Sequence, residues 1–217
     1  LRDNQCEDRT DSAVWQLPTF PATREEVTLH LRDYILSIAE HYDRNAPLSS
    51  DAQRLLRAAA DHLSDHVPPD LIVVGSGGKG VATFTPWIGF FNRLQAHSPQ
   101  AGIYVVYLFA EDLQSVTLAL LQGITQISEE HGWQEARRIL AERAAGFRRS
   151  LGNQALHGLM PSLALGSRAK RQAGYTAGTI AALRYNVASL PNEDALLLDL
   201  TRILSLYRQV GRTSSGN

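Results

Sequence analysis

The chain changes from helical to strand-like sequence at Leu71-Ile72-Val73-Val74-Gly75-Ser76-Gly77-Gly78-Lys79-Gly80, and this segment decides the fold. Its first four residues are apolar and mostly β-branched, which favours a strand, and the glycines end that strand. Two further runs of this kind follow at Ile103–Phe109 and Val116–Leu121. The connections between the three runs are too short for a helical crossover, so we predict antiparallel pairing.

Helical patterns lie on both sides of these strands. Two capping boxes, which satisfy the first amide groups of a helix, stand at Thr23–Glu26 and Ser50–Gln53. Apolar residues at helical spacing predict helices over residues 24–43, 51–67, 134–150, 175–186 and 193–209. The order helix, sheet, helix indicates an α+β fold, with a mainly antiparallel central sheet at about residues 70–125 flanked by N-terminal and C-terminal helices.

The length and composition suit one domain. With 217 residues, of which 44% are hydrophobic, the chain can bury a sizeable core. We expect an irregular segment at residues 1–22, a single domain at 23–210, and a linker or tail at 211–217 that leads to a separate effector domain. The single cysteine, Cys6, excludes a disulfide framework and favours a reducing, cytoplasmic location. No apolar run reaches the roughly 18 to 20 residues of a membrane span, so no membrane partner is expected.

Charge is distributed unevenly along the chain, although the net charge is only −1. Residues 1–70 carry 13 acidic side chains against seven arginines. No acidic residue occurs between positions 143 and 190, a stretch that contains Arg143, Arg148, Arg149, Arg168, Lys170, Arg171 and Arg184. Such asymmetry is typical of a face that binds a polyanion, and it is equally typical of a solvated face balanced by the acidic N-terminal part.

The glycine-rich segment Gly75–Gly80 matches the dinucleotide-binding pattern G-x-G-x-x-G by letter. That pattern works only where a helix begins at the glycines and presents its amide groups to the pyrophosphate. Here Pro86 falls within the required helix, where proline costs about 3 kcal/mol. The range 71–110 contains no Asp or Glu that could bind a ribose. Lys79 also lacks the Ser or Thr that follows the lysine of a P-loop. We therefore expect no nucleotide cofactor.

The sequence lacks the patterns of a catalytic centre. Metal-dependent nucleases of the Glu-x-Lys type need a carboxylate two residues before a lysine, and neither Lys79 nor Lys170 has one. His62 and His66 stand at a spacing that can bind zinc on a helix, but Leu63 replaces the glutamate of a metalloprotease and the nearby aspartates favour a solvated face. We expect no catalytic residue, no metal and no cofactor, and hence a binding module rather than an enzyme.

Three blocks of sequence keep the order and spacing of a known family: Gly75–Gly80 with Thr85-Pro86-Trp87-Ile88, then Gly102–Phe109, then Leu118–Thr125. A weaker similarity continues through Tyr175, Ile180, Tyr185, Leu190-Pro191, Asp199-Leu200 and Tyr207. Over roughly residues 25–210, the chain resembles the N-terminal DNA-binding domain of the McrB family, the modified-cytosine-specific restriction proteins.

The resemblance implies a reader of modified DNA. Members of the family hold duplex DNA and flip a modified cytosine (5-methyl or 5-hydroxymethyl) into a pocket, while a nuclease or NTPase domain or subunit acts elsewhere. The pocket wall aligns with Trp87, Tyr104 and Leu108, and the flipping loop aligns with Ser76, Gly77, Gly78, Lys79 and Gly80. Lys79 stands where the best-known member has an aromatic residue, and Val81-Ala82 replaces the family's usual Asn-Trp or Asn-Phe.

The residues themselves add a geometric argument for the pocket. Alternate residues of a strand share a face, so Tyr104, Val106 and Leu108 project together. An aromatic and an aliphatic side chain on one face could hold a flipped base by stacking. For the DNA backbone, the predicted contacts are Lys79, Arg168, Lys170, Arg171, Arg148 and Arg149.

Two functions therefore remain open at the level of sequence. One is a reader of double-stranded DNA that carries a modified base. The other is a protein-interaction or scaffold domain that has a basic face and no base pocket, in which the same aromatic residues are ordinary core.

Overall fold

The computed structural model describes residues 29–92, 100–166 and 170–214. They contain a five-stranded sheet in the order β1-β2-β3-β4-β5, in which every pairing is antiparallel. The strands are β1 (Leu71–Ser76), β2 (Trp87–Asn92), β3 (Ile103–Phe109), β4 (Ser115–Gln122) and β5 (Thr179–Asn186). Helices lie at both ends of the chain, so the predicted α+β class with an antiparallel sheet is confirmed.

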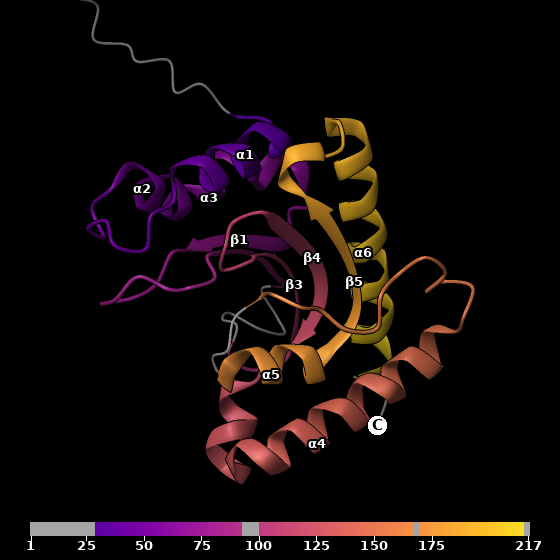
Figure 1. Cartoon of the computed structure of the whole chain (residues 1–217). Helices are drawn as coiled ribbons and strands as arrows, with labels where there is room; N and C mark the ends of the chain where they lie inside the picture. Colours follow the sequence, from indigo (N-terminus) through magenta and orange to yellow (C-terminus); the bar gives the residue numbers. More distant parts are fainter. Residues whose placement is uncertain (1–28, 93–99, 167–169, 215–217) are drawn as a thin grey trace, which may run out of the picture.

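The helices within the described residues surround a curved sheet (Figure 1). They are α1 (Leu31–His41), α2 (Asp51–Arg57), α3 (Ala59–Leu63), α4 (Thr125–Leu151), α5 (Lys170–Gly178) and α6 (Glu193–Ser214), with short 3-10 turns η1 (Ser64–His66) and η2 (Val187–Ser189). The convex face of the sheet packs against α1, α2, α3 and α6, whereas α5 and residues 160–166 lie on the concave side (Figure 1). None of the helices in the described ranges has both the length and the apolarity that a bilayer crossing requires.

The apolar alternation of β3 creates two cores, one on each face of the sheet. Val105, Tyr107 and Phe109 belong to the core on the convex side, and the partly buried Ile103 packs against it. Tyr104, Val106 and Leu108 belong to a smaller core on the concave side. This division confirms the predicted alternation, and it makes the concave side a distinct cluster rather than an extension of the main core.

One predicted helix is wrong. Residues 175–186 were expected to be helical, but α5 ends at Gly178 and residues Thr179–Asn186 form β5, which pairs with β4. The local sequence Ala181-Ala182-Leu183-Arg184 favours a helix by propensity. Pairing with β4 overrides that preference because it satisfies the backbone groups of β4 and buries Ile180 and Ala182 completely. The sheet therefore extends beyond the predicted range of 70–125.

The other predicted helices are confirmed with small changes. Residues 134–150 lie within α4, which has a kink where Gly132 adopts a φ of 74°. Residues 193–209 lie within α6, and the helix predicted at 51–67 is divided at Ala58 into α2 and α3. The helix predicted at 24–43 is represented by α1, and its first residues lie outside the described part of the chain.

Two buried tyrosines offer a matched test of the packing between the sheet and α6. The Tyr185 hydroxyl donates to Asp199 Oδ2 at 2.9 Å, whereas the Tyr107 hydroxyl has no partner among the described residues. We expect Tyr185→Phe to lower the free energy of unfolding by about 1 to 2 kcal/mol because Asp199 loses a donor. Tyr107→Phe should leave it unchanged or raise it. Chemical denaturation measures both, and equal losses would contradict this account.

Candidate nucleic-acid interface

The concave face of the sheet contains the three residues predicted to line a pocket. Trp87 of β2 lies opposite Leu108 of β3, which lies opposite Thr117 of β4. The row continues at both ends, because Ser76 pairs with Trp87 and Arg184 pairs with Thr117. Residues that pair directly across strands share a face of the sheet. The register therefore brings the end of β1, two predicted pocket residues and one exposed arginine into a single row.

Phe91, which was not among the predicted site residues, completes an aromatic cluster beside this row. Its ring stacks on Tyr104, with centroids 5.2 Å apart and an interplanar angle of 30°. It also meets Trp87 edge-on at 6.3 Å. A Cβ at Gly89 would lie 2.6 Å from the Phe91 ring, so only glycine leaves room for this arrangement. The sequence does contain a signal for this contact, because Phe91 stands four residues after Trp87 and therefore lies on the same face of the strand.

Residues 160–166 and α5 cover the aromatic cluster. Leu163 and Leu165 pack into the concave core, and Tyr175 of α5 packs against it. Several hydrogen bonds hold this cover. Thr176 Oγ1 donates to the Leu163 carbonyl at 3.0 Å, the Glu111 amide donates to the Leu165 carbonyl at 3.0 Å, and Met160 exchanges two backbone hydrogen bonds with Ala182 of β5, at 2.8 and 2.9 Å.

The three predicted pocket residues differ in how far solvent reaches them. Tyr104 and Leu108 are only 1% and 2% exposed. Trp87 at the edge of the cluster is half-buried. Of the three, Trp87 is thus the side chain that a ligand can reach without moving the leucines of the cover.

The glycine-rich loop is fixed at its base. The Tyr42 hydroxyl lies 2.7 Å from the Thr83 carbonyl oxygen and 3.0 Å from that of Gly77. Gln53 Nε2 and the Thr83 amide also donate to the Gly77 carbonyl, at 3.0 and 2.8 Å. Burial raises the pKa of Tyr42 and keeps its hydroxyl protonated as a donor. A Cβ at Gly77 would lie 2.4 Å from Gln53 Oε1, so any other residue there would displace the amide group of Gln53.

The tip of the same loop is open. Lys79 and Gly80 are exposed, and Val81 is 74% exposed. Gly80 adopts a φ of 78°, and nothing lies within 4 Å of the position a Cβ would occupy there. The loop returns into β2 rather than into a helix, so it lacks the geometry of a dinucleotide-binding turn and extends beyond the sheet as a hairpin tip (Figure 1).

The predicted backbone-binding arginines have different environments. Arg148 Nη1 donates to the carbonyl oxygens of Thr179 at 2.8 Å and Pro161 at 3.2 Å, and burial lowers the pKa of its guanidinium. Arg148 therefore fastens α4 to the start of β5 and to the covering segment. Arg149 is exposed. Arg168 and the side chains of Lys170 and Arg171 lie outside the described part of the chain.

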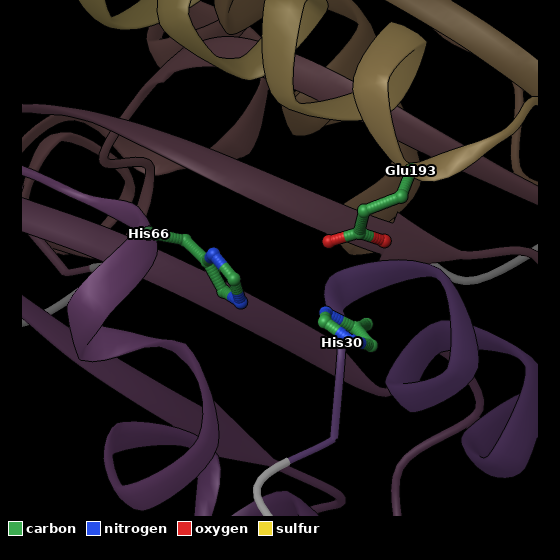
Figure 2. A group of neighbouring side chains, drawn as sticks. All are labelled: His30, His66 and Glu193. Atoms are coloured by element: carbon green, nitrogen blue, oxygen red, sulfur yellow. The ribbon is translucent and has the colours of Figure 1, made fainter.

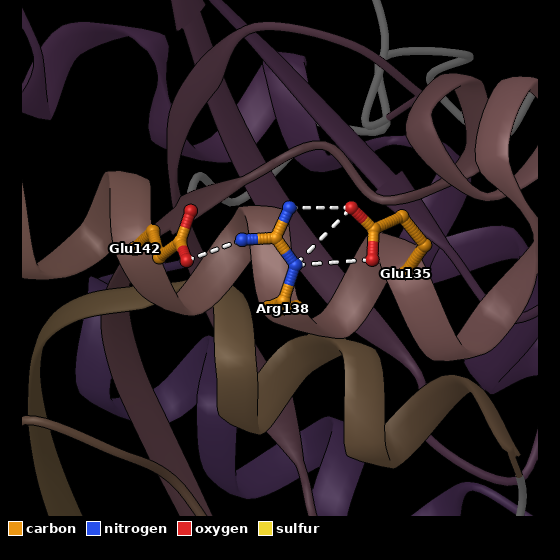
Figure 3. A network of polar contacts seen from close by, with 3 residues as sticks. All are labelled: Glu135, Arg138 and Glu142. Carbon is orange, nitrogen blue, oxygen red and sulfur yellow. Dashed lines mark hydrogen bonds and ion pairs between the residues drawn. The ribbon is translucent and has the colours of Figure 1, made fainter.

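Another arginine of α4 is already neutralised. Arg138 donates through Nε to both carboxylate oxygens of Glu135, at 3.1 and 3.0 Å, and through Nη1 to Glu142 at 2.5 Å (Figure 3). The hydrogen bond and the charge of Glu135 raise the pKa of Arg138, and the same hydrogen bond lowers the pKa of Glu135. Its charge is balanced at close range, so it contributes little to a field that attracts polyanions.

The neighbouring arginines Arg148 and Arg149 provide a direct test of this difference. Arg148→Ala removes the donor from two carbonyl oxygens, and we expect it to lower the free energy of unfolding by about 1 to 3 kcal/mol. Arg149→Ala changes an exposed position and should stay within about 0.5 kcal/mol of the unmodified chain. Thermal or urea unfolding of the two variants measures this difference. If Arg149→Ala lowers the free energy of unfolding as much as Arg148→Ala does, the structural role of Arg148 is refuted.

Comparison with known proteins agrees with the family resemblance of the sequence blocks. No curated protein matches the chain significantly. The model of the family described as "MrcB-like, N-terminal domain" matches residues 31–212. The match begins at the first residue of α1 and ends two residues before the end of α6, so it encloses the whole sheet. The predicted family resemblance is confirmed, and the chain belongs to the family of MrcB-like N-terminal domains.

Proposed function

We propose that this domain binds duplex DNA that carries a modified cytosine, 5-methyl or 5-hydroxymethyl, and holds the flipped base against Trp87, Tyr104 and Leu108. A separate nuclease or NTPase domain or subunit would then act on the DNA. One observation carries the proposal: Ser76, at the root of the glycine-rich loop, pairs directly with Trp87. The root of the loop that would enter the duplex and the ring that would receive the base are therefore direct neighbours, and membership of the MrcB-like family supports this use.

The energetics of base flipping favour a tight aromatic site. Stacking on an aromatic side chain contributes on the order of 1–3 kcal/mol per base, and extrusion from the duplex costs a few kcal/mol. A buried methyl group adds only about 0.8 kcal/mol. Because Leu163 and Leu165 pack in the same buried cluster as Tyr104 and Leu108, these two leucines must move aside before a base can insert fully. Trp87 is the first ring that an entering base meets.

Cations near the loop and the row would supply the sequence-independent part of binding. Lys79 stands on the exposed tip, and Arg184 ends the concave row at the edge strand β5. Arg149 is a second exposed arginine within the acid-free stretch. Each phosphate that these groups neutralise releases counterions and adds salt dependence to the binding. Arg168, Lys170 and Arg171 belong to the same proposal by sequence, whereas Arg148 is engaged within the fold.

The decisive experiment compares duplexes that differ only in one modified cytosine. We expect Trp87→Ala to weaken binding of the modified duplex about 5- to 150-fold, as loss of one stacking contact predicts, and to leave binding of the plain duplex nearly unchanged. Trp133→Ala is the matched control, because Trp133 is a tryptophan 38% exposed on α4 and does not belong to the concave core. Fluorescence anisotropy measures both affinities, and circular dichroism verifies folding.

The outcome separates the two candidate functions. Loss of the preference for the modified duplex in Trp87→Ala, with retained folding, supports a base pocket. If the unmodified chain binds both duplexes equally, the base pocket is refuted although DNA binding remains. If it binds neither duplex, the result favours a protein-interaction or scaffold module.

The phosphate contact proposed for Lys79 can be tested through the salt dependence of binding. If it contacts one phosphate, Lys79→Ala should weaken binding to modified and plain duplexes alike and reduce the slope of log K against log salt by about 0.9. Arg138→Ala removes the same formal charge from a site where Glu135 and Glu142 already balance it. That control should leave the slope unchanged. A selective effect of Lys79→Ala on the modified duplex alone would contradict a phosphate contact and would assign the lysine to the base.

A further inference from the structure

Three side chains that are far apart in the sequence meet at the end of the helical layer. His30 precedes the first residue of α1, His66 ends η1, and Glu193 is the first residue of α6. One nitrogen of each imidazole and one carboxylate oxygen all lie within 4.8 Å of one another. Figure 2 shows the Glu193 carboxylate directed from the start of α6 toward the two rings.

The fold itself fixes the carboxylate in this position. Glu193 Oε1 accepts the Leu31 amide at 3.0 Å, and Oε2 accepts the Arg32 amide at 2.8 Å. Glu193 thus caps the positive end of α1 from another helix, a role that the His30 side chain at the N-cap position does not fill. Each oxygen accepts one of these hydrogen bonds and retains a second lone pair. The carboxylate is therefore an oriented ligand with free coordinating capacity.

The two imidazoles are available for the same purpose. Among the described residues, no hydrogen bond or ion pair within the structure engages the ring of His30 or His66. His66 is half-buried and His30 is exposed, so the cluster remains accessible from solvent. His62, four residues before His66, is used differently: its Nδ1 lies 3.3 Å from the Leu29 amide, and its ring packs 5.4 Å from that of Tyr34.

The distances suit a small divalent ion after a modest rotation of the side chains. Three atoms at most 4.8 Å apart share a point within about 2.8 Å of each, and zinc requires about 2.0–2.2 Å to nitrogen and oxygen ligands. Rotation of the two imidazole side chains closes that difference, while the hydrogen-bonded carboxylate keeps its place. Two nitrogens and one oxygen are a ligand set for Zn²⁺ or a related first-row ion, whereas Mg²⁺ and Ca²⁺ prefer oxygen alone.

We propose that His30, His66 and Glu193 form a binding site for a divalent first-row transition metal, Zn²⁺ above all, with water as the fourth ligand. The site joins the start of α1, the turn before β1 and the start of α6. These elements meet only in the folded chain, so the metal binds the folded state and stabilises it. The site lies among the helices of the convex side and is independent of the proposed DNA contacts.

The test uses the full chain after treatment with a chelator. We expect one equivalent of Zn²⁺ to bind per chain and to raise the Tm by several degrees. Co²⁺ should give visible absorption bands of a four-coordinate site. Mg²⁺ and Ca²⁺ should produce neither effect, because the site contains two imidazoles.

Three variants assign the metal to these residues. His66→Gln and His30→Gln should each weaken Zn²⁺ binding by at least about tenfold and abolish the rise in Tm. His41→Gln is the matched control, because His41 is an exposed histidine that ends α1 and belongs to no such cluster within the described residues. It should bind zinc as the unmodified chain does.

A fourth variant separates the two roles of Glu193. Glu193→Gln should lower the Tm of the metal-free chain, through loss of the charged cap, and should also reduce the further rise on adding Zn²⁺. The proposal is overturned if the unmodified chain binds no stoichiometric Zn²⁺, or if His66→Gln and His30→Gln bind it as tightly as His41→Gln.

Discussion

The central sheet must be covered on both faces, because β4 is buried at every position and β3 at all but its first. A strand with apolar side chains on both sides cannot leave either face in water without losing the free energy of burial. Regular helices α1, α2, α3 and α6 meet this demand on the convex side. On the concave side, an irregular segment and one short helix meet it together with the aromatic cluster. The candidate site lies in this second, less regular layer.

The two covers differ in how they are held. The convex helices bury large side chains along continuous stripes, and contacts such as the Tyr185–Asp199 hydrogen bond tie them to the sheet. The concave cover is irregular: two leucines and Tyr175 pack into it, and hydrogen bonds that involve Thr176, Glu111, Met160 and Arg148 hold it. Segments with few buried contacts open at lower free energy than packed helices. We therefore expect the concave core to open at a lower cost than the core beneath the helices.

The arginine side chains of this domain differ in whether other groups of the fold already engage their charge. Arg148 stabilises the connection between α4 and β5, Arg138 is balanced by two glutamates, and Arg149 stays exposed. Glu193 similarly stabilises α1 while facing two histidines. The excess of arginine in the sequence indicates a basic region, but the capacity to attract a polyanion belongs only to those members that the fold leaves unpaired.

The sequence by itself determined the features that depend on near neighbours. Periodicity located α1, α6, β3 and β4, the strand alternation separated Tyr104 from Tyr107, and Pro86 excluded a nucleotide-binding helix after the glycines. Tertiary structure alone decided that residues 179–186 form a strand, because a partner strand distant in the sequence outweighs local helix propensity. It alone also placed Phe91 on Tyr104, and His30 and His66 beside Glu193. Those contacts join residues across turns and between layers, and no local pattern encodes the register or packing that brings them together.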